Sequence, residues 1–325
     1  MAAAPEPHLE KRRLALFGAP CDLGASLRGA NMGPAALRVA RLAETIREMG
    51  YEVQDRGDLG MEANSIAASI PGLSGNYAKA PEISVWTKAV ESEALNIFAD
   101  GALPVFMGGD HSLSIGTLTA AAKHARTLKR KLFVLWVDAH ADFNTPATSP
   151  SGNVHGMTLA VACGEPGLDI FRDADFALIP PSQVFMIGIR QIDKGERRLL
   201  EDRGVNVVDM PQIDETGVAV QMRKILEGVR KENGMLHVSL DADFLDPVIA
   251  PGVGTPVQGG ATYREAHLVM EMLEDSGLMT SLDLVEVNPF LDERGRTALL
   301  IVDLCASLFG RSILDRPIYN PGRKS

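Results

Sequence analysis

The stretch KLFVLWVDAHADFN, residues 131–144, decides the fold class. After one lysine it has six consecutive apolar residues, Leu132 to Val137, and then becomes polar. A half-buried strand alternates apolar and polar side chains, whereas a strand covered on both faces is apolar throughout. We therefore expect this run to form a strand inside a parallel sheet that carries helices on both faces.

Similar apolar runs recur along the chain, separated by segments of helical length. The runs are Leu14 to Phe17, Leu103 to Met107, Leu132 to Val137, Val184 to Ile189, Leu236 to Leu240 and Leu282 to Val287. The helical segments include Leu113 to Arg126, Val218 to Arg230 and Tyr263 to Leu273. Alternation of strand and helix over nearly the whole length predicts an α/β fold, with a mainly parallel sheet between two layers of helices.

No linker or internal repeat divides the 325 residues, so we expect a single domain over residues 1–325, with a flexible N-terminal segment at residues 1–13. The longest irregular stretches, Met61 to Pro81 and Phe143 to Ser151, are expected to be loops. Gly33 and Pro34 are expected to begin a helix, because proline is favoured in the first turn.

The charge and cysteine content exclude several classes of protein. The net charge of −10, from 32 basic and 42 acidic residues, disfavours binding to nucleic acid or anionic lipid. The cysteines, Cys21, Cys163 and Cys305, are few and far apart, which indicates a reducing compartment. Apolar stretches of about 18 residues, as membrane spans require, do not occur. We expect a cytoplasmic protein whose partners are neither nucleic acid nor membrane.

Ligands of such sheets bind beyond the carboxyl ends of the strands, and polar residues gather there in the sequence. Asp138, His140 and Asp142 are spaced two residues apart, and Asp241 and Asp243 repeat this spacing. In an extended chain, each set would point to one side. One such aspartate alone is more often a helix cap or turn residue. Five ligand-type residues in two such sets instead favour a binding site.

The residue types at these strand ends indicate a metal site. The candidate ligands are His111, Asp138, His140, Asp142, Asp241 and Asp243. Four converging carboxylates with no Lys or Arg in either motif repel one another, so a cation has to compensate. A ligand set that is mostly oxygen with two nitrogens favours Mn²⁺, with Co²⁺, Ni²⁺ or Fe²⁺ as substitutes. Two such ions about 3.5–4 Å apart can share and activate a water, which predicts hydrolysis.

Six motifs together resemble those of the ureohydrolases, and of the arginases most closely. They are GGDHS (Gly108 to Ser112), DAHADFNTP (Asp138 to Pro146), SGNVHG (Ser151 to Gly156), SLDADFLDP (Ser239 to Pro247), GTPVQGG (Gly254 to Gly260) and VEVNP (Val285 to Pro289). The resemblance implies a three-layer α/β/α fold around about eight strands, and a homotrimer or homohexamer. It also implies two Mn²⁺ per subunit and hydrolysis of L-arginine to L-ornithine and urea by a metal-bridging hydroxide.

The resemblance also implies roles for individual residues. One ion would be held by His111, Asp138, Asp142 and Asp241, and the other by Asp138, His140, Asp241 and Asp243. Glu286 would bind the guanidinium group, and His155 would donate a proton to the leaving amine, as an imidazole that titrates near pH 6.5 can. The implied contacts to the rest of the substrate are Asn144, Ser151 and Asn153 at the α-carboxylate, Asp193 at the α-amino group, and Glu196 and Thr255.

Three alternatives remain open. A ureohydrolase of another guanidino compound, such as agmatine or guanidinobutyrate, would use the same metals. A homologue without turnover could bind metal and do no chemistry. A dinuclear phosphoesterase would need cationic residues for phosphate, which the strand ends almost lack. The chain also departs from the family at Gln191, where an additional aspartate is often found.

Overall fold

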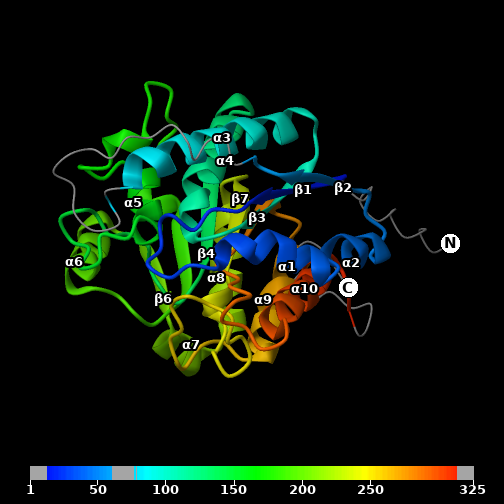
Figure 1. Cartoon of the computed structure of the whole chain (residues 1–325). Coiled ribbons are helices and arrows are strands. Elements are labelled where there is room, and N and C mark those ends of the chain that lie inside the picture. Colours follow the sequence, from blue (N-terminus) through cyan, green and yellow to red (C-terminus); the bar gives the residue numbers. More distant parts are fainter. Residues whose placement is uncertain (1–12, 61–76, 78, 313–325) are drawn as a thin grey trace.

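The computed structural model describes residues 13–60, 77 and 79–312 (Figure 1). Within these residues, eight strands form one sheet in the order β2-β1-β3-β8-β7-β4-β5-β6, and all neighbouring strands are parallel. The strands are β1 (Leu14–Ala19), β2 (Val53–Asp58), β3 (Leu103–Gly108), β4 (Leu132–Val137), β5 (Val184–Ile189), β6 (Asn206–Asp209), β7 (Met235–Asp241) and β8 (Met279–Val285). The expected α/β fold with about eight parallel strands is confirmed.

Two layers of helices cover the sheet (Figure 1). The core on one face includes side chains from α1 (Gly33–Val39), α2 (Leu42–Glu48), α7 (Met210–Thr216), α8 (Val218–Lys231), α9 (Tyr263–Ser276) and α10 (Arg296–Leu308). The core on the other face includes α3 (Ala80–Ala99), α4 (Ser114–Thr127), α5 (Thr158–Cys163) and α6 (Lys194–Arg203). Both faces of the inner strands are therefore buried, as their apolar runs require.

The expected strands are the six inner strands of the sheet, and the two that the apolar runs miss are its edges. The edge strands β2 and β6 are less buried than the inner strands, and β2 carries Asp55, Arg56 and Asp58. An edge strand has one neighbour only, so it needs no continuous apolar run. The run from Leu282 to Val287 is shifted, since β8 starts at Met279 and ends at Val285.

The helices follow the sequence pattern with small shifts. Gly33 begins α1 with proline in its first turn, as expected. The segment expected from Leu113 starts with a short 3-10 helix, η4 (His111–Leu113), before α4.

Of the two expected loops, residues 143–151 form no helix or strand, which confirms this one. Of the other expected loop, residues 61–76 and 78 lie outside the described part, and Ala80 and Pro81 belong to α3, so its end was wrong. The N-terminal segment lies outside the described residues apart from Arg13.

The sheet order places four chain segments of very different sequence position side by side. Strands β3, β8, β7 and β4 are consecutive in the centre of the sheet. Because all strands are parallel, their carboxyl ends lie on the same side of the sheet. The residues that lie there are His111 after β3, Glu286 after β8, Asp241 at the end of β7 and Asp138 after β4.

Candidate metal centre

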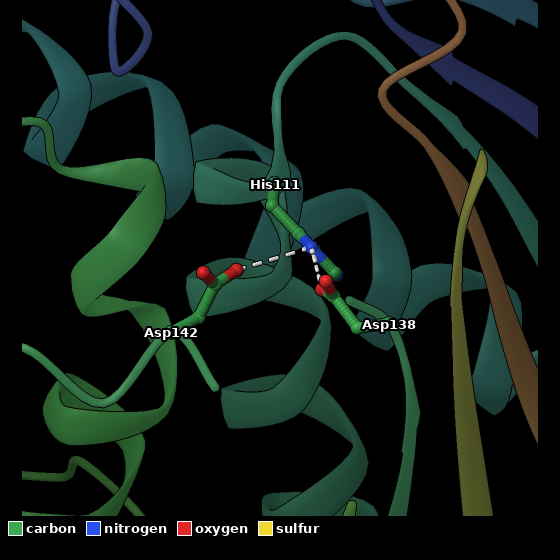
Figure 2. Close-up of side chains that lie close together, drawn as sticks. All are labelled: His111, Asp138 and Asp142. Atoms are coloured by element: carbon green, nitrogen blue, oxygen red, sulfur yellow. Dashed lines mark ion pairs between the residues drawn. The ribbon is translucent and has the colours of Figure 1, made fainter. Parts of the chain in front are cut away.

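The structure brings the six candidate ligands together at the carboxyl ends of the central strands. Potential ligand atoms of His111, Asp138 and Asp142 lie within 4.8 Å of one another, and Figure 2 shows the three side chains meeting. Asp138, His140 and Asp243 form a second such group, which shares Asp138 with the first. Asp241 joins the first group, with its Oδ2 atom 3.1 Å from Nδ1 of His111.

The convergence has a different origin from the extended chain that we expected. Strand β4 ends at Val137, and Asp142 has a positive φ of 48°. Asp241 is the last residue of β7, whereas Asp243 lies in the 3-10 helix η8 (Ala242–Phe244). The spacing of two residues therefore selected side chains that do lie close together, but the geometric reason was wrong. Turns after the strands, rather than continued strand, aim them at one point.

The surroundings of His111 fit a metal ion. Its Nδ1 atom lies 3.1–3.2 Å from one carboxylate oxygen each of Asp138, Asp142 and Asp241. This nitrogen and Oδ2 of Asp138 are nevertheless buried without a hydrogen bond. The other ring nitrogen is 2.8 Å from Oγ of Ser239, and donation there leaves a lone pair on Nδ1. Buried nitrogen and oxygen atoms that lie close together without hydrogen bonds are typical of a site that binds a cation.

The pKa values of the cluster also fit a missing positive charge. Burial raises the pKa of Asp241 well above its usual value, and Asp243 adds to this shift. Burial also opposes ionisation of Asp138, but His111 and His140 hold the pKa of Asp138 below its usual value. The pKa of His140 is raised to about 12, because Asp243 and Asp138 outweigh its burial. Without a cation, the cluster retains protons that divalent ions would displace.

A cavity of about 240 Å³ opens beside the cluster. Its lining residues are His140, Asp142, Asn144, Ser149, Ser151, Asn153, His155, Gly156, Gln191, Asp193, Glu196, Asp241 and Thr255. All the residues that the resemblance implied as contacts to the α-groups are among them, as are Glu196 and Thr255. This lining contains four acidic residues and no Lys or Arg, so the cavity favours a small cationic ligand.

Glu286, which is buried, and His155, which is partly buried, form a pair near the candidate ligands. Nδ1 of His155 is 2.8 Å from Oε1 of Glu286, which also accepts a hydrogen bond from the backbone N–H of His111. Burial lowers the pKa of His155, but Glu286 outweighs it, and the pKa is raised to about 9. Glu286 has a positive φ of 62°, an uncommon conformation that is typical of functional sites. The pair therefore places the imidazole of His155, which can donate a proton, in contact with the carboxylate of Glu286.

Hydrogen bonds connect the loops around the cavity. Nδ2 of Asn144 donates to Asp193 over 3.0 Å. Glu196 accepts from the backbone N–H groups of Phe143 and Asp193, so both of its oxygens face the main chain. Burial raises the pKa of Glu196 to about 7. These contacts give Glu196 a structural task between the two loops, and its contact with substrate stays a prediction.

Sequence reasoning missed three residues that support the cluster. Ser239 contacts His111 and lies two residues before Asp241 on β7, inside the strand rather than at its end. Asp110 accepts from Gly24 over 2.6 Å and is fully buried. Arg190 follows β5 directly and was omitted from the strand-end residues. A search of the last strand positions, and of every strand end, would have found all three.

Thr255, a predicted substrate contact, donates a 3.0 Å hydrogen bond to Oδ2 of Asp243. It therefore touches both the cavity and a candidate ligand. Ser151 and Asn153 contact each other, because the backbone N–H of Asn153 donates to Oγ of Ser151 over 3.2 Å. Oδ1 of Asn153 accepts from Ser26, which connects this loop to the segment after β1.

The parallel sheet and the ligand cluster at its carboxyl edge define an α/β protein with a candidate metal site, and known proteins share this design. A model of the Arginase family matches residues 12–310. Arginase of Brucella melitensis biotype 1 is 51% identical over 304 residues, which cover 93% of this chain and 97% of that protein. Arginase of Bacillus subtilis is 41% identical over 310 residues, which cover 93% and 99% of the two chains.

A solved structure agrees with these relatives. The native structure of arginase from Bacillus caldovelox has a TM-score of 0.85 and 38% identity, and covers 93% of this chain and all of that chain. The chain therefore belongs to the arginase family. The predicted resemblance to ureohydrolases, with arginase closest, is confirmed, and so is an arginase-type amidinohydrolase. The family implies a dinuclear metal site, which the two His/Asp groups can provide.

Among the described helices, none is long and apolar enough to cross a membrane.

Proposed function

We propose that the protein hydrolyses L-arginine to L-ornithine and urea at a centre of two Mn²⁺ ions. The observation that carries this proposal is the convergence of six His and Asp side chains at one end of an acidic cavity. The names of the relatives, Arginase in each case, support the substrate. Co²⁺, Ni²⁺ and Fe²⁺ are the substitutes that the ligand chemistry allows.

Six residues hold the ions in this proposal. His111, Asp138, Asp142 and Asp241 bind one ion, and Asp138, His140, Asp241 and Asp243 bind the other. Asp138 and Asp241 would serve as ligands of both ions. When bound, the ion pair supplies hydroxide near neutral pH by lowering the pKa of a water. The chain contributes the dry, rigid surroundings, since Asp138, Asp241 and Asp243 are almost fully buried.

Glu286 and His155 act on the two ends of the bond that breaks. Glu286 would bind the guanidinium group by charge-assisted hydrogen bonds and orient its carbon for hydrolysis. The bond from that carbon to Nε of arginine would break, and His155 would donate a proton to this nitrogen, which becomes the δ-amino group of ornithine. The proton that the added hydroxyl loses as the urea carbonyl forms would pass to solvent. The 2.8 Å contact between His155 and Glu286 supports this role, because it keeps the imidazole protonated up to about pH 9. Solvent then returns the proton.

The far end of the cavity distinguishes arginine from simpler guanidino compounds. Asn144, Ser151 and Asn153 bind the α-carboxylate, and Asp193 binds the α-amino group. The cavity lining includes all four, and Asn144 already positions Asp193 by a hydrogen bond. Contacts that lie several bonds from the reacting carbon place it for attack. A hydrolase of agmatine or guanidinobutyrate would have no use for the complete set.

Urea release from L-arginine, agmatine and guanidinobutyrate by the manganese-loaded chain tests the substrate. We expect a clear preference for arginine. A preference for agmatine or guanidinobutyrate would reassign the enzyme within the ureohydrolases, and no urea from any of the three would favour a homologue without turnover.

Variants of Asp193 test the α-amino contact. Asp193→Ala should raise the KM for arginine by roughly tenfold, because a charge-assisted hydrogen bond is lost, and should leave the KM for guanidinobutyrate, which lacks the α-amino group, nearly unchanged. Asp193→Asn is the matched control, since asparagine also caps the start of α6 but carries no charge. An equal loss with both substrates would show that Asp193 does not contact this group.

We further propose that the protein is cytoplasmic, forms a homotrimer or homohexamer, and acts in arginine metabolism, such as the urea cycle. The family resemblance supports the assembly. Light scattering of the purified protein would measure the number of subunits, and a monomer would contradict it.

A further inference from the structure

Arg190 has an unusual set of partners close to the metal cluster. It follows β5 and is partly buried. Its guanidinium group donates to five backbone carbonyls, those of Gly188, Asp243, Phe244, Leu245 and Val257. The shortest of these contacts, 2.6 Å, is from Nη2 to the carbonyl of Asp243. Among the described residues, no carboxylate forms an ion pair with this guanidinium group.

The chain makes room for the guanidinium group with glycines. A Cβ atom on Gly260 would lie 2.6 Å from Nη2 of Arg190 and equally close to the backbone of residues 245 and 246. Gly188 has a positive φ of 97°, and a Cβ atom there would meet the ring of Phe244. These close approaches let the loops at residues 243–246 and 257–260 pack around the guanidinium group, while the backbone N–H of Arg190 contacts a third segment at Ala139. The surrounding backbone therefore fits closely around the guanidinium group.

The three gathered segments are those that carry one half of the metal cluster. The first is the turn with Asp243, whose own carbonyl accepts from Arg190. The second is the loop at Val257, two residues after Thr255, which in turn donates to the Asp243 carboxylate. The third is reached through the backbone N–H of Arg190, which donates to the carbonyl of Ala139, next to His140. No comparable contact connects Arg190 to His111 or Asp142 within the described residues.

We propose that Arg190 is a positioning residue whose side chain fixes Asp243, a candidate ligand in the half of the metal site that Asp243 forms with His140. This inference rests on the metal centre of the proposed function and adds a task that the ligands themselves do not perform. A guanidinium group suits this role, because it is planar and charged and its five N–H donors lie in fixed directions, so that it binds several carbonyls at once. A lysine at this position keeps the charge but loses the planar set of donors.

Titration with Mn²⁺ alone, without substrate, tests the proposal. The metal-free chain and its variants Arg190→Lys and Arg190→Met are titrated by calorimetry, and electron paramagnetic resonance follows the magnetic coupling of the two ions. We expect both variants to raise the dissociation constant of the ion held by His140 and Asp243 by about 10–100-fold. The other ion should bind nearly as in the wild type, and the coupled signal should weaken.

Arg130 provides the matched control. Its guanidinium group also donates to backbone carbonyls, those of Asn233 and Gly234, but it precedes β4 at the opposite end of the sheet from the cluster. Arg130→Lys and Arg130→Met should leave both dissociation constants unchanged. If Arg190→Met does not fold, Arg190→Lys carries the test, because it fills the same space.

The outcomes separate this inference from the proposed function. Wild-type binding of Arg190→Lys at both sites would overturn the positioning role. Tighter binding by Arg190→Met would also overturn it, because Arg190 would then act only through charge repulsion of the ions. Equal weakening of both ions would show a general structural effect and would contradict it too. A wild-type chain that binds no Mn²⁺ would instead refute the metal centre itself.

Discussion

The imidazole of His155 and the carboxylate of Glu286 provide a pH-dependent contribution to stability. The pKa of His155 is raised from its usual 6.5 to about 9. A histidine whose pKa is raised by folding stabilises the fold fully below its unfolded value, and this contribution is lost as the pH rises through the folded value. We expect the metal-free chain to lose on the order of 3 kcal/mol from this pair between about pH 6 and pH 10.

Urea unfolding of the wild type and of His155→Gln at the two pH values measures this contribution. The variant should lose less stability than the wild type over the interval. His124→Gln is a control of opposite sign, because burial lowers the pKa of His124 and its neutral form is the stable one. Identical pH dependence of wild type and His155→Gln would contradict the pairing.

Asp138 is the residue whose loss should do most damage to the metal centre. It belongs to both groups of potential ligands and is fully buried. Asp138→Ala should therefore bind less than one Mn²⁺ per chain and release no urea above background. Metal analysis of the dialysed protein and a urea assay check both expectations. Glu232→Gln removes an exposed carboxylate far from the cluster and should change neither. Full activity of Asp138→Ala would refute a shared ligand.

The sequence predicted which residues lie at the strand ends, because that depends only on the residues next to each apolar run. His111, Asp138 and Asp241 follow or end apolar runs, so their position along the sheet edge could be foreseen. The contacts of Ser239 with His111 and of Arg190 with Val257 join residues 128 and 67 positions apart. Such partners depend on the strand order, which no single sequence segment encodes.

At the level of elements, Asp110 fastens the segment after β1 to the end of β3. It accepts hydrogen bonds from the backbone N–H groups of Gly24 and Ala25 and from Ser112. The same segment supports the cavity, because the carbonyl of Gly24 accepts from the backbone N–H of His155. Loss of the Asp110 carboxylate therefore disturbs one loop directly and a second loop through it.

Asp110→Ala should lower the free energy of unfolding by about 3 kcal/mol or more, because each buried donor without a partner costs about 1–3 kcal/mol. Hydrogen exchange at the amides of Gly24 and Ala25 should accelerate more than exchange in α8. Asp110→Asn keeps one acceptor oxygen and should lie between wild type and alanine. If exchange accelerates equally everywhere, the effect is a global loss of stability and the local fastening is refuted.

The elements that the sequence did not predict share a physical reason. Strands β2 and β6 are edges, so their side chains mix polar and apolar types and show no run. Charged residues on an edge, such as Asp55 and Arg56 on β2, also discourage pairing with another chain. The inner strands have no such freedom, which is why their pattern was clear.

For the whole molecule, metal binding should appear as thermal stability. A ligand that binds only the folded state at a hundred times its dissociation constant adds about 2.7 kcal/mol. For a chain of this size, that raises the Tm by about 5 °C. Calorimetry at one scan rate, with Mn²⁺ or with a chelator, measures the difference. Asp138→Ala should show no response to Mn²⁺, and a shift as large as that of the wild type would mean that the ions bind elsewhere.

The order of strands in the sheet has a consequence for biosynthesis. The two halves β2-β1-β3 and β4-β5-β6 leave the ribosome before β7 and β8, which lie between them in the sheet. Each nascent half exposes an apolar inner edge until residues 235–285 arrive and join the halves. Asp241 and Asp243 belong to this late segment, so the candidate metal centre is complete only when translation is nearly finished.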